Sequence, residues 1–226
     1  MDKYVYVNSE VLKNKFSITD EKELARKERT KSSIRLLEIL DGEAKIKHTF
    51  DLEHLQKIHK YLFQDIYTWA GKIRDVDIAK GDTLFCKAIN IDNFSKEIFS
   101  KLQRENFFKG TTKKEELVEK LATLFLDINA LHPFREGNGR TQREFIRELA
   151  EERGFDLDFK NISKEEMIEL SIRDNPKKEV ARIFLENIRE KKDISKDNPW
   201  AEKANSDKDN LWIKKEDKNK DNEWEL

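Results

Sequence analysis

The chain has 226 residues, of which 37% are hydrophobic and 40% are charged, enough for one domain with a buried core and a densely charged surface. Its formal net charge is -1, so the chain lacks the strongly basic composition of proteins that bind nucleic acid or anionic membranes mainly through charge. Cys86 is the single cysteine, which excludes an internal disulfide framework and fits a reducing compartment.

The sequence contains no stretch of about 18 or more apolar residues, so no membrane-spanning helix is predicted. The first residues lack a basic segment followed by an apolar one, so no secretory signal is expected. We therefore expect a cytoplasmic protein without direct contact to membrane or nucleic acid. Export to a host cell through a system that reads other signals is the alternative.

The chain contains only seven Gly and three Pro, the residues that most often interrupt helices, which predicts a mainly α-helical protein. Asp20 and Glu23 can cap a first helix, and Asp51 and Asp92 can each open another. The apolar positions of these three helices are Leu24, Ile34, Leu37 and Leu40, then Leu52, Leu55, Ile58, Leu62 and Phe63, then Phe94, Ile98, Phe99 and Leu102.

The strongest helical periodicity follows a capping box formed by Thr112 and Glu115. Apolar residues then recur at helical spacing on one stripe, which predicts a central helix; they are Leu117, Leu121, Leu124, Ile128 and Leu131. A further helix is expected from Asn138 to a stop at Gly154, and another from Pro176.

Two segments depart from this helical pattern. Residues 73–91 alternate apolar and polar positions around a turn at 80–82, which predicts a β-hairpin leaning on the helical body. Residues 191–226 are rich in Lys, Asp, Asn and Glu, which predicts a flexible tail. A short Asn-x-Trp pattern recurs there every 12 residues, ending at Trp200, Trp212 and Trp224, so docking on the body or on a partner is the alternative.

The most informative stretch runs from His132 to Arg143 and reads HPFREGNGRTQR. It predicts a short glycine-containing loop that leads into a helix N-terminus, where exposed N–H groups and the helix dipole favour phosphate. Gly137 and Gly139 would let the backbone approach an anion closely, and Asn138 could cap the helix or contact phosphate. Arg140 and Arg143 are three residues apart, on one helix face, and both can hold phosphate oxygens.

The remaining polar residues of this stretch suggest a reaction. Glu136 near phosphates indicates Mg²⁺, which takes one or two carboxylates together with phosphate oxygens. His132 can serve as a general base, because the unperturbed imidazole is largely neutral near pH 7, and Pro133 restricts its backbone. A lone His, an Asn-Gly turn or an Arg-x-x-Arg face is usually structural. All of them in order within 12 residues favour nucleotidyl or phosphoryl transfer.

This stretch matches in full the signature HPFx(D/E)GNGRxxR, and the chain thereby resembles the Fic family. The upstream segment from Tyr67 to Arg74 and the predicted hairpin are also similar to the family. The resemblance covers about residues 5–190, so we expect a Fic domain over 1–190, with its core at 51–155, its flap at 73–91 and its active-site loop at 132–140. It leaves the tail, 191–226, unexplained.

The resemblance implies a protein adenylyltransferase that uses ATP and Mg²⁺. His132 would take the proton of a Tyr, Ser or Thr hydroxyl on a target protein, and Phe134, with Pro133, would anchor the loop. Glu136 would bind Mg²⁺. The nucleotide phosphates would bind at the remaining motif positions, which are Gly137, Asn138, Gly139, Arg140 and Arg143.

The hairpin resembles the flap on which the family docks its targets, and an open strand edge could pair with an extended target segment. Lys80 and Gly81 are expected to touch the nucleotide, and Asn106 and Phe107 to lie at the adenine, with core packing as the alternative for Phe107. The target-docking residues would be Thr83, Leu84, Phe85 and Cys86.

Two features place the chain within the family. The Doc-like branch, which transfers phosphate, has Ala and Lys where this chain has Gly137 and Gly139, so AMP transfer is expected. The family's inhibitory motif (S/T)xxxE(G/N) does not occur in this chain. We therefore expect inhibition in trans by a small antitoxin whose Glu pairs with Arg143, as in class I Fic toxins.

Three functional hypotheses follow from the resemblance. The first is a toxin that modifies type II topoisomerases, DNA gyrase and topoisomerase IV. The second is a secreted effector that modifies small GTPases of a host. The third is a non-catalytic nucleotide-binding or interaction scaffold, against which the intact His132 and Glu136 argue. His54 and His59 are five residues apart, which does not suit joint metal binding on one helix face, and both are interpreted as packing or surface residues.

Overall fold

The computed structural model describes residues 2–80, 83–160, 162 and 176–191, with the side chains of Lys80 and Thr83 left undescribed. Two compact units, Met1–Glu190 and Lys191–Leu226, divide the chain, and nearly all of the second lies outside the described residues. The elements of the first are α1 Glu21–Leu40, α2 Leu52–Phe63, β1 Ala79–Lys80, β2 Thr83–Leu84, η1 Ala88–Asn90, α3 Ile91–Arg104, η2 Asn106–Phe108, α4 Lys114–Leu131, α5 Asn138–Glu152, β3 Phe155–Leu157, α7 Pro176–Asn187 and β4 Ile188–Glu190.

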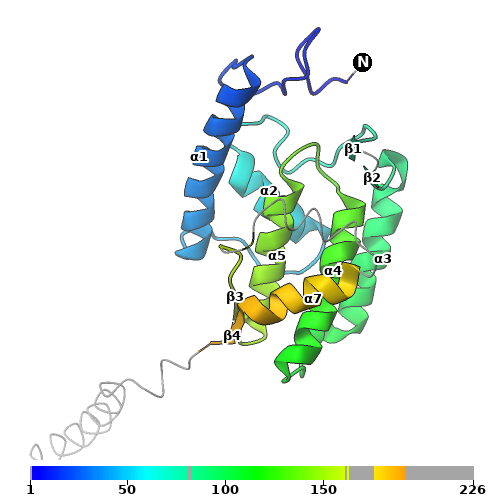
Figure 1. Ribbon diagram of the computed structural model, residues 1–226. Coiled ribbons are helices and arrows are strands. Elements are labelled where there is room, and N and C mark those ends of the chain that lie inside the picture. The colour runs from blue at the N-terminus through cyan, green and yellow to red at the C-terminus, as the bar shows by residue number, and fades with distance from the viewer. Residues whose placement is uncertain (1, 81–82, 161, 163–175, 192–226) are drawn as a thin grey trace, which may run out of the picture. The chain divides into compact units, whose positions relative to one another are not determined.

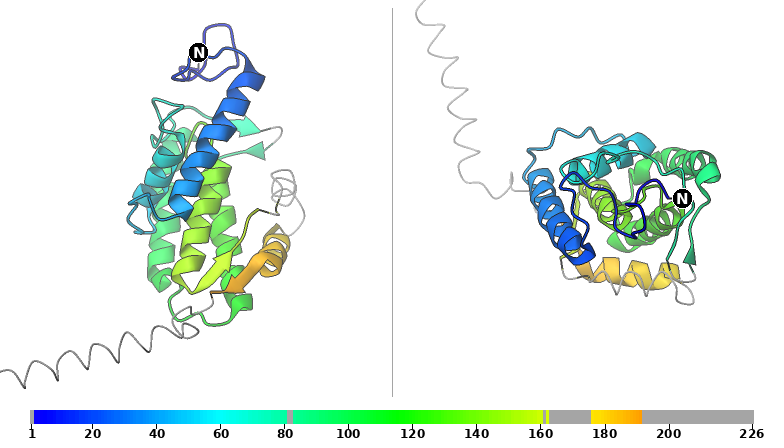
Figure 2. Two further views of the ribbon diagram at one scale, coloured as in Figure 1. Left: turned by 90° about the vertical axis from the view of Figure 1, so that its left-hand side faces the viewer. Right: turned by 90° about the horizontal axis from the view of Figure 1, so that it is seen from above.

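The centre of the first unit is the pair α4 and α5, which run in opposite directions and are joined by the loop 132–137 (Figure 1). Helix α3 packs on α4, whereas α2 packs on both α5 and α1. Helix α7 crosses α4, and β4 then pairs antiparallel with β3, with Leu157 opposite Ile188 (Figure 2). The sequence-based prediction of a mainly α-helical fold with a small hairpin is confirmed.

The core follows the apolar periodicity that predicts the helices. The apolar stripe of α4 is buried along its whole length, from Leu117 to Leu131. Helix α5 adds Phe145, Ile146 and Leu149, none of which is exposed to solvent. Because these two helices are fixed by a shared core, the short loop between them has fixed ends.

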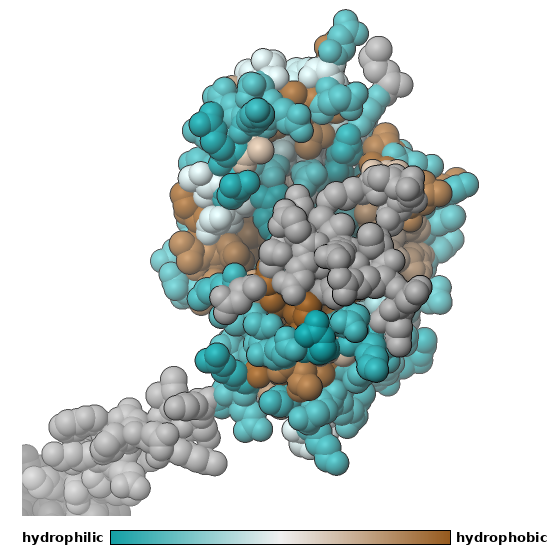
Figure 3. All heavy atoms as spheres, in the orientation of Figure 1, coloured by the Kyte–Doolittle hydropathy of each residue, from teal (hydrophilic) through white to brown (hydrophobic). Residues whose placement is uncertain are grey.

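Helix α1 differs from the other helices, because it turns a mixed polar face inward. Its buried residues are Leu24, Glu28, Ser32 and Ile39. Its large apolar residues Ile34, Leu37 and Leu40 are instead 46%, 58% and 41% exposed. Figure 3 shows apolar surface on the side of the molecule where α1 lies. No helix in the described part of the chain combines the length and apolarity needed to cross a membrane.

Helix starts were predicted with mixed success. The side chains of Asp20 and Asp51 accept hydrogen bonds from the backbone N–H groups of Glu23 and His54, as expected of N-caps. The capping box at Thr112 is wrong, because α4 begins after Lys113 and no side chain caps it. Helix α3 begins at Ile91, one residue before the expected Asp92.

The predicted hairpin over 73–91 is correct only around its turn. Strand pairing is limited to Ala79 with Leu84 and Lys80 with Thr83, and residues 88–90 form a 3-10 turn in place of a strand. The physical reason is that both ends of the hairpin bond to the loop region. The Arg74 N–H donates to the Pro133 carbonyl and the Cys86 N–H to the Ala130 carbonyl, each at 2.9 Å.

Candidate active site

The loop 132–137 begins where α4 ends in a left-handed residue. His132 has φ 43° and ψ 60°, and its N–H still bonds to the Ile128 carbonyl at 3.0 Å. This conformation costs a residue other than glycine about 1–2 kcal/mol, so the surroundings must compensate for it. It turns the chain away from the helix axis and projects the imidazole from the end of α4.

The two nitrogens of His132 have different roles. Nδ1 lies 3.2 Å from the carbonyl oxygen of Asn129, which can only accept a hydrogen bond, so Nδ1 carries the proton. In the neutral ring Nε2 is then the basic nitrogen, as general-base catalysis requires. The ring of Phe85, from the flap, stacks on the imidazole with centroids 3.6 Å apart and planes at 17°.

The interior of the loop is anchored in the core. Phe134 is fully buried and stacks on the ring of His59, with centroids 3.9 Å apart. The amide of Asn138 accepts from the Phe134 N–H at 2.9 Å and donates to the Phe134 carbonyl at 2.8 Å. Asn138 therefore does not cap α5 through its side chain, as one alternative supposed, but holds the loop closed.

His59 supports the loop from α2. Its Nδ1 accepts from the Gly71 N–H at 2.8 Å, so Nε2 carries the proton and donates to the Glu136 carbonyl at 2.9 Å. Burial lowers the pKa of His59 to about 3, which keeps the ring neutral at any physiological pH. The interpretation of His59 as a packing or surface residue was therefore incomplete, because it also holds the backbone of the loop.

Gly137 permits the loop to enter α5 at close range to α2. It is the N-terminal cap residue, with φ 83°, and a Cβ there would lie 2.4 Å from the ring of Phe63. Phe63 is fully buried and cannot move aside. A Cβ at Gly139 would instead have the flexible end of Arg143 as its nearest neighbour, at 3.4 Å. Of these two glycines, only Gly137 is therefore required because a side chain would not fit.

A pocket of about 510 Å³ opens in front of the N-terminus of α5. Its lining comes from four parts of the chain: the N-terminal segment, α1, the segment after α2 and the signature stretch. The lining residues are Glu10, Val11, Leu12, Glu21, Leu24, Ala25, Glu28, Arg29, Tyr67, Arg135, Glu136, Gly137, Gly139, Arg140 and Arg143. The lining holds four arginines and four glutamates. Three of the arginines belong to the signature stretch, and together with the N-terminal N–H groups of α5 they make this part of the pocket a suitable site for phosphates.

The two motif arginines differ in their surroundings. Arg140 donates to the Ser32 hydroxyl at 2.8 Å and pairs with Glu28, which also accepts from the Tyr67 hydroxyl. Burial and the Glu28 charge raise the pKa of Tyr67, so it remains a donor. Arg143 has no hydrogen-bond or ion-pair partner among the residues that the structure describes, and burial, together with the Arg140 charge, lowers its pKa. A partly buried, uncompensated cation favours binding of an anion.

Glu136 could hold a metal ion. Its side chain is 46% exposed, lines the pocket, and accepts from the Gly137 N–H at 2.9 Å. A single accessible carboxylate beside a phosphate site fits Mg²⁺, which binds few protein ligands and completes its shell with phosphate and water oxygens.

The other predicted site residues are placed as follows. Leu84 is 83% exposed at the flap strand, and Cys86 anchors the flap through its backbone. Lys80 and Thr83 are described only by their backbone, and Gly81 lies outside the described residues. The pocket lining does not include Asn106 or Phe107, which follow α3 in left-handed conformations, and Phe107 lines a different pocket of about 410 Å³.

Sequence reasoning missed the residues that support the loop. Glu28 and Ser32 fall on the same helical face as Leu24, and two polar residues on an otherwise apolar face could have signalled an inward-facing site. His54 was also interpreted as a packing or surface residue. It is fully buried, and its Nε2 lies 2.8 Å from Glu148. Its Nδ1 accepts from the Phe50 N–H, so Nε2 carries a proton and favours a pair with the carboxylate over a metal.

The close approach at Gly137 gives a first prediction. Gly137→Ala should lower the free energy of unfolding by roughly 2–5 kcal/mol, because the methyl group adds overpacking against Phe63 to the cost of a left-handed alanine. Gly154→Ala is the matched control, since Gly154 has φ 85° with no atom within 4 Å of its Cβ. Denaturant titration of both variants measures the difference. Equal losses would mean that the contact with Phe63 is unimportant.

The burial of His59 gives a second prediction, about pH. Its pKa is lower in the folded chain, about 3, than in the unfolded chain, about 6.5, so the folded state binds fewer protons between these values. Stability should fall as the pH drops through this window, by up to about 1.4 kcal/mol per pH unit, and should be unaffected above it.

Denaturant titrations between pH 7 and pH 4 measure this slope. His59→Gln should be less stable than wild type at pH 7 and should lose less stability on acidification. The same slope in both proteins would show that His59 is not held neutral by burial.

Comparison with known proteins agrees with this geometry. Residues 49–150 match the Fic/DOC family. Over 171 residues the chain is 40% identical to the protein adenylyltransferase VbhT of Bartonella schoenbuchensis, which covers 76% of this chain but 35% of VbhT. It is 35% identical over 164 residues to the probable protein adenylyltransferase Fic of Escherichia coli, which covers 73% of this chain and 80% of that protein.

Solved structures share the fold. The Fic domain of the VirB-translocated effector protein Bep8 from Bartonella sp. 1-1C superposes with a TM-score of 0.76 at 28% identity, covering 81% of this chain and 93% of that one. The effector protein BepC from Bartonella tribocorum, with bound AMPPNP, has a TM-score of 0.73 at 26% identity over 84% and 97%. On its signature loop, its fold and these relatives, the chain belongs to the Fic/DOC family.

Proposed function

We propose that this chain transfers AMP from ATP to a hydroxyl group of a target protein. The observation that carries the proposal is the pairing of a histidine whose Nδ1 is protonated with an adjoining phosphate-type pocket. The names of the relatives VbhT and Fic, both adenylyltransferases, support the same activity.

In the proposed reaction Nε2 of His132 accepts the proton of the target hydroxyl as its oxygen attacks the α-phosphorus of ATP. The bond between the α-phosphorus and the bridging oxygen breaks, and pyrophosphate leaves with that electron pair. The N-terminal N–H groups of α5 and the guanidinium of Arg143 would hold the phosphates in line for this displacement. Glu136 would hold Mg²⁺, which supplies charge neutralisation to the phosphates when bound.

The flap is proposed to present the target. Its two short strands carry the exposed Leu84 next to Phe85, which stacks on His132. An extended segment of the target that adds to this edge would bring its hydroxyl toward the imidazole. Backbone pairing would supply affinity and the side-chain contacts would supply selectivity, as in other cases of strand addition.

We further propose that the chain acts as a toxin whose inhibition comes from a separate antitoxin, with type II topoisomerases as targets. The support is that no carboxylate in the described part of the chain pairs with Arg143. A Glu supplied in trans could bind that cation and exclude the γ-phosphate. An effector directed at host GTPases is the second candidate, favoured by structural relatives that are VirB-translocated effectors.

The catalytic proposal predicts a specific loss of activity. Wild type incubated with Mg²⁺, bacterial lysate and ATP labelled at the α-phosphate should label discrete proteins, and His132→Ala should label none. The expected loss is about 10²–10⁴-fold, the usual contribution of a general base. Label transferred from the γ-phosphate alone would mean phosphotransfer and would overturn the proposal.

Two further arms separate the remaining candidates. Arrest of bacterial growth by wild type, but not by His132→Ala, supports the toxin. Labelling of GTPases in a eukaryotic lysate, with no effect on bacterial growth, supports the effector. Nucleotide binding by wild type without label in either lysate supports the non-catalytic scaffold.

A further inference from the structure

Arg74 is the largest of the fully buried side chains among the described residues, yet it is a cation that forms no ion pair with them. It is 2% exposed and lies in the segment between α2 and β1. Among the residues that the structure describes, no carboxylate forms a salt bridge with it, and burial lowers its pKa. A buried charge of this kind destabilises the fold unless its N–H donors are hydrogen-bonded, so the guanidinium must have acceptors close by.

All three side-chain hydrogen bonds of Arg74 go to backbone carbonyl oxygens. Nε donates to His132 at 2.8 Å, Nη1 donates to Val76 at 2.7 Å, and Nη2 donates to Cys86. These carbonyls belong to three places: the catalytic loop, the chain entering β1, and the chain leaving β2. A planar fork of donors can bond in three directions at once, which a lysine ammonium on a flexible stem cannot reproduce in the same geometry.

Two backbone bonds reinforce this clasp, by which we mean Arg74 with the three carbonyls that it binds. The Arg74 N–H donates to the Pro133 carbonyl and the Cys86 N–H to the Ala130 carbonyl, each at 2.9 Å. The bonds therefore lie on both sides of His132 and join it to both ends of the flap. They offset the cost of its left-handed conformation, since its carbonyl is fixed by a charge-assisted hydrogen bond.

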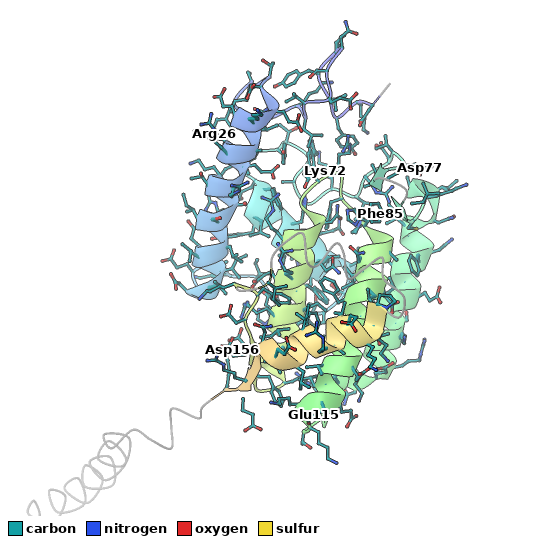
Figure 4. The ribbon with its side chains drawn as sticks, in the orientation of Figure 1. Arg26, Lys72, Asp77, Phe85, Glu115 and Asp156 are labelled. Atoms are coloured by element: carbon teal, nitrogen blue, oxygen red, sulfur yellow. The ribbon has the colours of Figure 1, made fainter. Side chains whose placement is uncertain are left out.

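The clasp also determines where Phe85 lies. Phe85 directly precedes Cys86, whose N–H and carbonyl are both bonded, and its ring stacks on His132 with centroids 3.6 Å apart. Figure 4 shows Phe85 at the end of α4 opposite Glu115, with Lys72 and Asp77 on the chain that leads into the flap. The imidazole is thus held from its backbone by Arg74 and across its face by a residue that Arg74 indirectly fixes.

We propose that Arg74 is a positioning residue that sets the imidazole of His132 relative to the flap, so that a target held by the flap meets Nε2. The inference deepens the proposed AMP transfer and rests on it. Arg74 does not touch the substrates in this account. It acts through the carbonyls of His132 and Cys86. Its loss should therefore disturb the ring of His132 and lower kcat/KM for the protein target more than it weakens the binding of ATP.

The test compares Arg74→Lys and Arg74→Met with Arg153→Lys and Arg153→Met. Arg153 is the matched control, because its side chain is 8% exposed and it lies at the far end of α5 from the loop. Long-range ¹H–¹⁵N NMR spectra of the histidine rings resolve the tautomers, and the chain has only four histidines. His132→Ala assigns the signal of the catalytic ring.

We expect wild type and both Arg153 variants to show His132 as a single tautomer with the proton on Nδ1. Both Arg74 variants should show mixed tautomers or exchange broadening at His132, with the other three rings unchanged. An unaltered His132 signal in both Arg74 variants would overturn the proposal. Equal changes in all four rings would also overturn it, since they would show a general loss of structure.

Kinetics give a second readout. In Arg74→Lys, kcat/KM for the protein target should fall by about 10²-fold, the effect of misplacing a reacting group by about 1 Å, while the dissociation constant for ATP stays the same. An equal loss of ATP affinity would contradict a role confined to His132 and the flap. If wild type transfers no AMP at all, the proposed function fails, and the NMR comparison still decides whether Arg74 sets the ring.

Discussion

The site depends on hydrogen bonds from buried side chains to the backbone of the loop 132–137. His59 donates to the carbonyl of Glu136, and Arg74 donates to the carbonyl of His132. The side-chain amide of Asn138 bonds to both the N–H and the carbonyl of Phe134. A short loop between two helices cannot satisfy its own polar groups, so unpaired donors and acceptors in a buried loop would be costly. Three side chains from three parts of the chain meet this requirement and define one loop conformation.

Most residues of the loop 132–137 hold its conformation and take no direct part in the proposed reaction. Pro133 and Phe134 anchor it, and Gly137 allows it to pass against Phe63. His132 stays half-buried, and the pocket is lined by Glu136 and by the first turn of α5 with its arginines. Phosphoryl-group chemistry needs mainly positioned donors and a base, so a rigid loop is a sufficient scaffold for the proposed reaction.

The two arginines divide the electrostatic work. Arg140 is neutralised by Glu28 and fixed by Ser32, so it contributes geometry at little change in net charge. Arg143 keeps an uncompensated charge within the described residues and therefore dominates the attraction for an anion. In the proposed inhibition in trans, a carboxylate from a partner protein would compete with phosphate for Arg143.

Periodicity and local signals predicted the helices well where a helix buries an apolar stripe that is visible in sequence, as in α4. In α1, by contrast, three of the four apolar residues on which the prediction rested, Ile34, Leu37 and Leu40, are exposed. The signature stretch also identified the loop and the start of α5. The length of the hairpin was overestimated, since the bonds of Arg74 and Cys86 to the loop replace strand pairing. The roles of Glu28, His59 and Arg74 were not predictable from one sequence, because each depends on contacts over 58 to 112 residues of chain.

Amide hydrogen exchange tests most directly whether the loop is formed before the nucleotide binds. The Phe134 N–H, bonded to Asn138, and the Thr141 N–H, bonded to the Gly137 carbonyl at 3.2 Å, report on its two ends. If the loop is already formed, both amides should be strongly protected without nucleotide and should change little on adding Mg²⁺ and AMPPNP. Exchange at the rate of an open loop, slowing only when nucleotide is added, would contradict a preformed loop.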